Sequence, residues 1–154
     1  ADPESTRSDP ESTRSAMIST LTRRTLPAGA RGFTAMVVRS ASEAEAAGTS
    51  TSELREVARV QELPQQDPDA TVEVAVTHSD LNYKDGLIVL GRKGVVKAFP
   101  IVPGIDFAGV VAHSRSPRFS EGDVVALTGN KAGQYFDGGY AQRASCQAEH
   151  LVRL

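Results

Sequence analysis

The feature that most constrains the fold is a series of short apolar runs, each bounded by turn-forming residues. Residues 71–77 (TVEVAVT) give the clearest example, since Val72, Val74 and Val76 alternate with polar or small residues. That period of two is typical of a strand with one buried face. Strands are also expected over residues 34–39, 54–63, 105–112, 124–128, 140–146 and 151–154. Several short strands separated by turns predict a mainly β fold, a small barrel or sandwich.

One short helix is expected among these strands. Ser79 or Asp80 could cap a helix that runs through residues 84–90, and Gly91 would end it because glycine tolerates a positive φ. Residues 40–52 are small and polar, and they are expected to form a loop. Turns or loops are also expected over residues 64–69, 94–103, 117–123 and 129–139. The last of these holds four glycines and is expected to be exposed.

The N-terminal part is expected to lie outside the fold. Residues 2–8 read DPESTRS and residues 9–15 repeat the same letters, so residues 1–16 are interpreted as an artificial linker. Residues 16–42 lack Asp and Glu and carry Arg23, Arg24, Arg31 and Arg39 with several Ser and Thr, and residues 17–32 are the part expected to lie before the fold. That composition is typical of a mitochondrial transit peptide. An uninformative disordered extension of a cytoplasmic protein is the alternative. The folded domain is expected over residues 33–154.

Composition excludes several classes of function. The net charge of −2 gives no reason to expect a nucleic acid or an anionic membrane as partner. No stretch approaches ~18 uninterrupted apolar residues, the length that spans a bilayer. The single cysteine, Cys146, excludes an intrachain disulfide and a thiolate metal cluster. The absence of Trp argues against a platform on which nucleic-acid bases stack.

A cluster of polar side chains directly follows the expected strand at residues 71–77. Residues 79–85 read SDLNYKD and bring Asn82, Tyr83 and Lys84 to the first turn of the expected helix. Side chains that emerge where a strand ends can line a cleft on a rigid scaffold. Helix capping and solvated charge explain the same residues without a function.

A second polar feature lies within residues 99–111 (FPIVPGIDFAGVV). Two prolines and Gly104 predict a turn into a strand, and Gly109 inside that strand indicates a bulge or a close backbone contact. Asp106 is a carboxylate within an otherwise apolar run, and its burial would require a partner. Two further stretches, GDVV at residues 122–125 and DGGYA at residues 137–141, are explained as turns into strands.

In this order, the N-Y-K-D, F-P-x-x-P-G-x-D-x-A-G-V-V, E-G-D-V-V and G-G-Y-A motifs resemble the medium-chain dehydrogenase/reductase superfamily. They are most similar to its quinone-oxidoreductase-like branch, which includes acrylyl-CoA reductases. The resemblance covers residues 34–154 and implies a GroES-like catalytic domain, a partly open β-barrel with one or two short helices. In that superfamily a Rossmann domain follows and carries NADPH. This sequence has no G-x-G-x-x-G motif, so NADPH is expected in the full-length parent and is not expected to bind tightly to this chain alone.

The resemblance also implies that no metal is bound. Zinc-dependent relatives place a Cys where Asn82 stands and Gly-His-Glu where Gly104, Ile105 and Asp106 stand. A catalytic zinc needs three N, S or O protein ligands. Because Asn82 and Ile105 cannot supply a thiolate and an imidazole, a zinc-independent reductase is expected.

The resemblance assigns roles to the polar cluster. Asn82 and Tyr83 are the catalytic candidates, and Asn82, Tyr83 and Lys84 are the candidates for contact with the cofactor. Asn82 would contact the substrate carbonyl or the nicotinamide amide, and Tyr83 would orient the ribose or donate a proton. Lys84 is equally well explained as a solvated charge. Lys93 stands where some enoyl reductases of the superfamily carry a tyrosine, so their proton donor does not transfer to this chain.

The implied substrate is a small molecule, either a quinone or a 2-enoyl thioester such as acrylyl-CoA. Arg92, Lys93 and Lys97 lie close together in the sequence and could bind the phosphates of an acyl-CoA. An exposed, solvated loop is the simpler explanation for these three residues. A catalytically inactive barrel that serves as a binding or association module is the alternative function. Unpaired edge strands could also join two chains into a homodimer.

Overall fold

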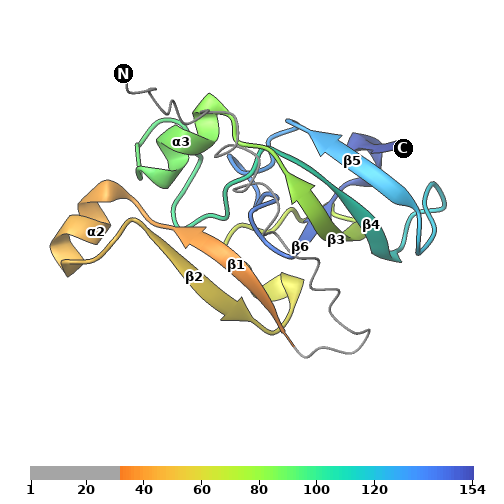
Figure 1. Cartoon of the computed structure of the whole chain (residues 1–154), viewed down its shortest axis with the longest axis horizontal. Coiled ribbons are helices and arrows are strands. Elements are labelled where there is room, and N and C mark those ends of the chain that lie inside the picture. Colours follow the sequence, from red (N-terminus) through yellow and green to blue (C-terminus); the bar gives the residue numbers. More distant parts are fainter. Residues whose placement is uncertain (1–31) are drawn as a thin grey trace, which may run out of the picture. The chain divides into compact units, whose positions relative to one another are not determined.

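A computed structural model describes residues 32–154. The linker expected over residues 1–16 and the extension expected over residues 17–32 lie outside the described residues, apart from Gly32. The mitochondrial location that rests on them therefore stays a prediction. The described part is mainly β, as predicted, with two α-helices (Figure 1). None of its helices is both long enough and apolar enough to cross a bilayer.

The larger sheet has five antiparallel strands in the order β6-β3-β4-β5-β7. β3 (Val72–Ser79) and β4 (Asp106–Ser114) form its centre. β5 (Val124–Thr128) and β6 (Arg143–Cys146) flank them, and β7 (Leu151–Arg153) lies at the edge beside β5. The prediction of short strands with turns between them is confirmed for all of these elements.

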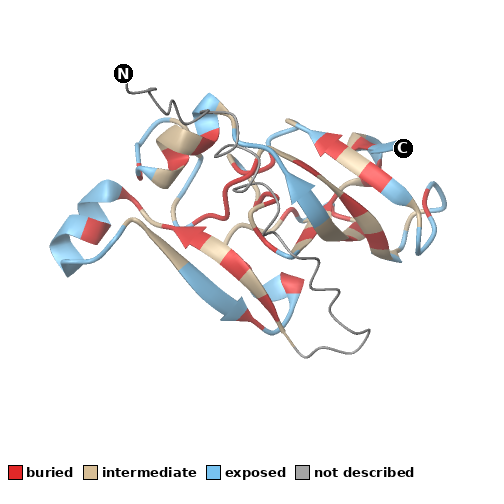
Figure 2. Ribbon diagram, in the orientation of Figure 1, coloured by how far each residue is buried: buried red, intermediate tan, exposed pale blue. Residues whose placement is uncertain are grey.

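Alternation of side chains builds the core of this sheet. Figure 2 shows buried and more exposed residues alternating along β4 and β5. The buried residues of one face form a single apolar cluster, made of Val72, Val74, Phe107, Val111, Phe119, Val125, Leu127, Ala132, Ala144, Cys146, Ala148 and Leu151. Ala148 belongs to a short 3₁₀-helix, η2 (Ala148–His150), that precedes β7. Burial of this apolar area is the main term that stabilises the sheet.

A second, smaller sheet consists of β1 (Phe33–Val38) and β2 (Ser52–Val57), which pair antiparallel. Backbone hydrogen bonds connect β1 to loops of the larger sheet. Val38 and Ile101 exchange hydrogen bonds at 2.8 and 2.9 Å, and the N–H of Met36 donates to the carbonyl oxygen of Tyr140 at 2.8 Å. The two sheets are joined but not closed, which confirms the predicted partly open GroES-like barrel.

The prediction of a loop over residues 40–52 is wrong, because residues 41–47 form α2 (Ala41–Ala47). Ser40 and Glu43 form a capping box. The Ser40 Oγ accepts from the Glu43 N–H at 3.3 Å, and the Glu43 carboxylate accepts from the Ser40 N–H at 3.0 Å. Gly48, with φ 63°, ends the helix. The capping signal and the alanines that follow it therefore outweigh the polar composition.

The strand expected over residues 54–63 is also too long. β2 ends at Val57, and a 3₁₀-helix, η1 (Val60–Glu62), follows it. Val60 and Leu63 are both buried in the apolar cluster under the smaller sheet. Their three-residue spacing matches the period of a 3₁₀-helix, in which side chains at i and i+3 align.

Residues 129–139 form a loop, as predicted, but residues 132–133 and 137–139 of that loop are buried rather than exposed. The Gly138 N–H donates to the Val102 carbonyl oxygen at 2.8 Å. A Cβ at Gly138 would overlap the carbonyl oxygens of Pro103 and Gly104. Only glycine allows so close an approach. This loop therefore packs on the segment that leads into β4.

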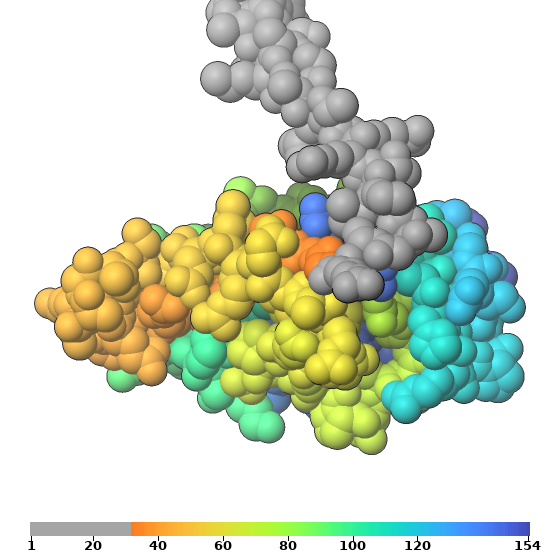
Figure 3. Space-filling view, turned by 90° about the horizontal axis from the view of Figure 1, so that it is seen from below, coloured from red at the N-terminus to blue at the C-terminus, as the bar shows by residue number. Residues whose placement is uncertain are grey.

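In Figure 3, α2 and the turn between β4 and β5 lie at opposite ends of the face shown.

Gly109 fulfils the expectation of a close backbone contact. It lies in β4 opposite β3, next to a register irregularity between Val76 and His78. A Cβ at this position would overlap the carbonyl oxygen of Ala75. The irregularity shifts the end of β3, which is the end that leads to the predicted polar cluster.

Candidate functional site

The predicted polar cluster lies where β3 ends and α3 (Tyr83–Val89) begins. Asn82 is the N-cap residue of α3, and its N–H donates to the Asp85 Oδ2 at 3.0 Å. The prediction that Ser79 or Asp80 caps the helix is wrong, because β3 continues through Ser79. In a capping box the side chain of the third helical residue accepts from the backbone N–H of the N-cap residue, so Asp85 can pair in this way only with Asn82.

The side chain of Asn82 is held by Asp106. Its Nδ2 donates to the Asp106 Oδ2 at 2.7 Å, and the Asp106 Oδ1 accepts from the Gly129 N–H at 2.8 Å. Asp106 therefore has the hydrogen-bond partners that a carboxylate within an apolar run is expected to need. Since an ionised carboxylate only accepts hydrogen bonds, the pair fixes the amide nitrogen toward Asp106. The second Nδ2 proton has no acceptor within residues 32–154 and is available to a ligand.

Asp85 connects α3 to the entry of β4. Its side chain is fully buried, and its Oδ1 accepts from the N–H groups of Gly104 and Ile105 at 3.0 and 3.1 Å. With the cap bond to Asn82, one carboxylate satisfies three backbone N–H groups. Asp85 thereby fixes the two segments that carry Asn82 and Asp106 relative to one another.

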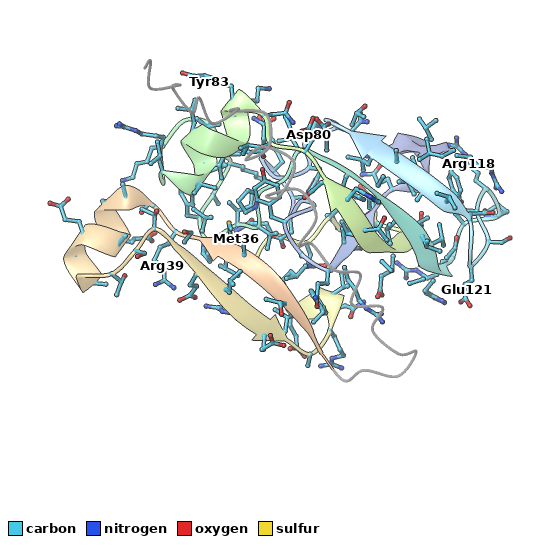
Figure 4. The ribbon with its side chains drawn as sticks, in the orientation of Figure 1. Met36, Arg39, Asp80, Tyr83, Arg118 and Glu121 are labelled. Atoms are coloured by element: carbon cyan, nitrogen blue, oxygen red, sulfur yellow. The ribbon has the colours of Figure 1, made fainter. Side chains whose placement is uncertain are left out.

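Tyr83 does not join the Asn82–Asp106 pair. Its side chain is 83% exposed, and Figure 4 shows it on the outer side of α3. Tyr83 and Asn82 line a shallow hollow of about 430 Å³. The other lining residues are apolar or glycine, namely Leu81, Gly86, Leu87 and Leu90. An apolar hollow beside a polar group suits a flat, apolar ligand that carries a carbonyl or an amide.

Lys84 points toward a different partner. Its exposed Nζ lies 3.5 Å from the Oε1 of Gln134, which belongs to the loop over residues 129–139. Its nearest hydrogen-bond partner is therefore not in the Asn82–Asp106 pair. The cofactor contact expected for Lys84 stays a prediction.

Tyr140 is a residue at this site that the sequence analysis treats only as part of a turn. Its hydroxyl donates to the carbonyl oxygen of Asp80 at 3.1 Å, so it contacts the segment between β3 and Asn82. Burial, together with the nearby carboxylates of Asp85 and Asp80, raises the pKa of Tyr140 to about 12. Tyr140 therefore stays protonated at neutral pH and acts as a donor. The partner lies sixty positions away in the sequence, so no local pattern indicates it.

Asp137 is a second residue whose role the sequence analysis misses. Its Oδ2 accepts from the Gln65 N–H at 2.6 Å, and its Oδ1 accepts from the Val102 N–H at 2.8 Å. Burial raises the pKa of Asp137 to about 6, although the two backbone hydrogen bonds oppose that rise. This buried carboxyl group connects η1, the segment before β4 and the loop over residues 129–139.

The residues at the site are poor ligands for zinc. No group of three His, Cys, Asp or Glu side chains that could hold a metal ion occurs in the part of the chain described. The Asn82–Asp106 pair offers one amide and one carboxylate, whereas a catalytic zinc needs three protein ligands. Burial raises the pKa of the Cys146 thiol to about 12, so it offers no thiolate at neutral pH. Independence from zinc stays a prediction.

Comparison with known families gives one match that covers most of the larger sheet. The family described as the alcohol dehydrogenase GroES-like domain matches residues 68–154. That range includes Asn82, Asp85, Asp106 and Tyr140. It therefore contains the Asn82–Asp106 pair and its supporting residues, whereas Gln65, the partner of Asp137, lies outside it.

Two curated relatives match just over half of the chain. Acrylyl-CoA reductase AcuI from Ruegeria pomeroyi is 48% identical over 87 residues, which is 56% of this chain and 26% of the relative. The putative quinone oxidoreductase YhfP from Bacillus subtilis is 41% identical over 87 residues, again 56% of this chain and 26% of the relative. The matched region thus spans about a quarter of the length of these proteins.

Solved structures show the same fold. The yhdH oxidoreductase from Salmonella enterica, in complex with NADP, is 36% identical with a TM-score of 0.66, over 79% of this chain and 34% of that one. The YhdH protein of Escherichia coli with bound NADPH is 38% identical with a TM-score of 0.58, over 67% of this chain and 31% of that one. With its partly open barrel and its match over residues 68–154, the chain belongs to the alcohol dehydrogenase GroES-like family of the medium-chain dehydrogenase/reductase superfamily.

Proposed function

We propose that residues 33–154 form the substrate-side domain of an NADPH-dependent, zinc-independent reductase that acts on 2-enoyl thioesters or quinones. The observation that carries this proposal is the amide of Asn82, which Asp106 fixes in place beside an apolar hollow. The relatives named acrylyl-CoA reductase and quinone oxidoreductase, and the related structures that hold NADP or NADPH, support it.

The nicotinamide cofactor, when bound, supplies a hydride to the β-carbon of the activated alkene or to the quinone. The apolar lining of the hollow next to Asn82, which includes Leu81, fits the flat nicotinamide ring. Contact with the cofactor is assigned to Asn82, Tyr83 and Lys84. The phosphates and adenosine must be held outside this chain, since the sequence has no G-x-G-x-x-G motif.

Asn82 is assigned the polarising role. As the alkene or quinone is reduced, negative charge develops on the carbonyl oxygen of the substrate. The second Nδ2 proton of Asn82 can donate to that oxygen, because the first is already bound to Asp106. A donor fixed in advance costs no reorganisation when the charge develops, and such a donor contributes about 10²- to 10³-fold to kcat. Asp106 acts as a positioning residue through Asn82.

Tyr83 is assigned the role of proton donor. Reduction of an enoyl group leaves a carbanion-like α-carbon that must receive a proton. A phenol is protonated at neutral pH and can serve as a general acid. The Tyr83 hydroxyl makes no hydrogen bond to any described residue, so a substrate in the neighbouring hollow would not have to displace a partner.

An inactive barrel that only binds or associates is the competing function, and the missing dinucleotide motif favours it for this chain taken alone. The first test is the encoding gene, whose reading frame should continue into a glycine-rich βαβ unit. The second is titration of NADPH against this chain, which should show only weak binding. A Kd near ~1 µM or below would contradict the assignment of the phosphate contacts to another domain.

The direct test is turnover by the complete gene product. NADPH absorbance should fall in the presence of acrylyl-CoA or a benzoquinone, and it should not fall with propionyl-CoA or a hydroquinone, which are already reduced. Turnover should persist after dialysis against a zinc chelator. Failure to oxidise NADPH with either oxidised substrate would contradict the proposed function, and loss of turnover on chelation would contradict independence from zinc.

A further inference from the structure

The lysines of this chain are confined to one region. All four lysines in the sequence lie in α3, in residues 91–100 or in residues 129–139. Arg92 belongs to the same region. All five side chains are exposed, and they define what is here called the basic surface: Lys84, Arg92, Lys93, Lys97 and Lys131.

Gln134 holds the three segments of the basic surface together. Its Nε2 donates to the Val95 carbonyl oxygen at 3.0 Å, and its backbone carbonyl accepts from the Lys97 N–H at 2.8 Å. Its Oε1 lies 3.5 Å from the Lys84 Nζ, and its own N–H donates to the Lys131 carbonyl oxygen at 3.1 Å. Gln134 therefore brings together the three segments that carry the lysines, through the side chain of Lys84 and the backbones of Lys97 and Lys131.

No carboxylate forms an ion pair with any member of the basic surface in the region covered by the structure. Most arginines elsewhere in the described residues differ, since Arg39, Arg55, Arg59, Arg143 and Arg153 each lie against a Glu or Asp, whereas Arg115 and Arg118 do not. An unpaired group of positive charges raises the local concentration of anions.

A hollow of about 480 Å³ opens at the basic surface between α2 and residues 93–99. Lys93 and Lys97 line it together with Ser42, Glu43 and Phe99. Glu43 is the one acidic residue there. Hydrogen bonds from Ser40 and the charges of Lys93 and Arg39 lower the pKa of Glu43, so it remains ionised. The lysines still outnumber it, and the serine hydroxyl and Phe99 ring add a donor and an apolar wall.

We infer that the basic surface binds the phosphate groups of an acyl-CoA, with Lys93 and Lys97 as the main contacts and the thioester directed toward Asn82. This inference rests on the proposed function and selects between its two substrate classes. A quinone carries no phosphate and has no use for these charges, whereas coenzyme A carries several. Lysine is a common phosphate ligand that acts as a point charge.

The spacing along α3 suits such a ligand. A helix rises 1.5 Å per residue, so the two cap residues of α3, Asn82 and Leu90, lie about 12 Å apart. The pantetheine arm of coenzyme A is longer than that when extended. The arm would follow α3 past Leu90, which is exposed at the end of this helix. One ligand can therefore reach both the basic surface and the amide of Asn82.

The test on this chain is titration with coenzyme A by calorimetry at low salt. The wild-type chain should bind coenzyme A, and K93A/K97A should raise the Kd by about tenfold or more. The control R55A/R59A removes the same charge from β2 and the segment after it, and it should leave the Kd unchanged. Pantetheine, which lacks the phosphates of coenzyme A, should bind much more weakly. Equal affinity of the wild type and K93A/K97A for coenzyme A, or no binding by the wild type, would overturn the inference.

Two further measurements distinguish coenzyme A from NADPH as the ligand of the basic surface, and distinguish a failure of this inference from a failure of the proposed function. If NADPH binds this chain as tightly as coenzyme A and is weakened equally by K93A/K97A, the surface serves the cofactor and the inference fails. In the complete gene product, K93A/K97A should raise KM for acrylyl-CoA while quinone reduction keeps its kcat/KM. An equal loss for both substrates, or none for either, overturns the inference and leaves the proposed function standing. Only a wild-type protein that reduces neither substrate removes the proposed function itself.

Discussion

The five-stranded sheet and the loops beside α3 are stabilised by different means. In the sheet, apolar side chains such as Val74 and Leu127 alternate with exposed ones and form one core. In the loops, the buried carboxylates of Asp85 and Asp137 accept backbone N–H groups from segments far apart in the sequence. The sheet supplies a rigid support, and the carboxylates set the positions of the loops on which the candidate site depends. The comparison predicts that substitutions in the two regions differ in what they disturb.

The largest loss of stability is expected in the sheet. Leu127 is 1% exposed, and Leu127→Ala should lower the free energy of unfolding by about 2–5 kcal/mol, from lost burial and the cavity left behind. Val124→Ala, on the exposed side of the same strand, should cost less than about 1 kcal/mol. Urea unfolding measures both. Equal losses of unfolding free energy in the two variants would mean that the sheet is not stabilised by its buried face.

The next effect tests the carboxylates of the loops. Asp85→Asn replaces one accepting oxygen by an NH₂ group and leaves buried N–H groups without an acceptor, which should cost about 3 kcal/mol. The same change at Asp69, an exposed carboxylate, should cost little. The Asn82 and Gly104 amide resonances should also shift in the Asp85 variant. A stability close to that of the wild type would contradict the role assigned to Asp85.

The dependence of stability on pH should single out Asp137. The pKa of Asp137 is about 6 in the folded protein and 3.8 in an unfolded chain, so the folded state holds the proton more tightly. The stability from this group is fully present below pH 3.8 and is lost as the pH rises through about 6. The loss corresponds to about 3 kcal/mol at most. Unfolding free energies measured from pH 4 to pH 7 should show this fall, and Asp137→Asn should remove it. An identical pH profile in that variant would contradict the assignment.

The smallest effect is expected at the cap of α2. Ser40→Ala removes the hydroxyl that accepts from the Glu43 N–H, and it should lower the unfolding free energy by about 1 kcal/mol. Ser50→Ala, at an exposed position after the helix, is the matched control. If Ser40→Ala and Ser50→Ala are equally mild, the capping box contributes nothing to stability.

The sheet could be predicted from the sequence because its signals are local. Val72, Val74 and Val76 alternate within one run, and β5 coincides with the expected residues 124–128. The helix α2 could also have been found, since Ser40 and Glu43 have the spacing of a capping box. The 3₁₀-helix at Val60 was hidden because its three-residue period fits neither a strand nor an α-helix.

The candidate site could be predicted only in part. The residues after β3 stand out locally, and Asp106 stands out as a charge among apolar neighbours. The pairing of Asn82 with Asp106 joins residues 24 positions apart, and that of Asp137 with Gln65 joins residues 72 positions apart. Such contacts depend on how the loops fold over the sheet, and no pattern within either segment encodes them. The side chain of Tyr83 points outward because Tyr83 is the first residue of α3, and this direction likewise depends on where the helix begins.

The central claim is that the amide of Asn82, fixed by Asp106, polarises the substrate carbonyl. The most direct measurement is kcat/KM of the complete gene product carrying Asn82→Ala, with acrylyl-CoA and with a benzoquinone. We expect a fall of about 10²- to 10³-fold, expressed mainly in kcat. The melting temperature should fall only slightly, from the lost cap and the lost hydrogen bond to Asp106. Gln61→Ala, which removes an exposed amide from η1, should keep wild-type activity. Wild-type kcat/KM in the Asn82→Ala enzyme would contradict the account.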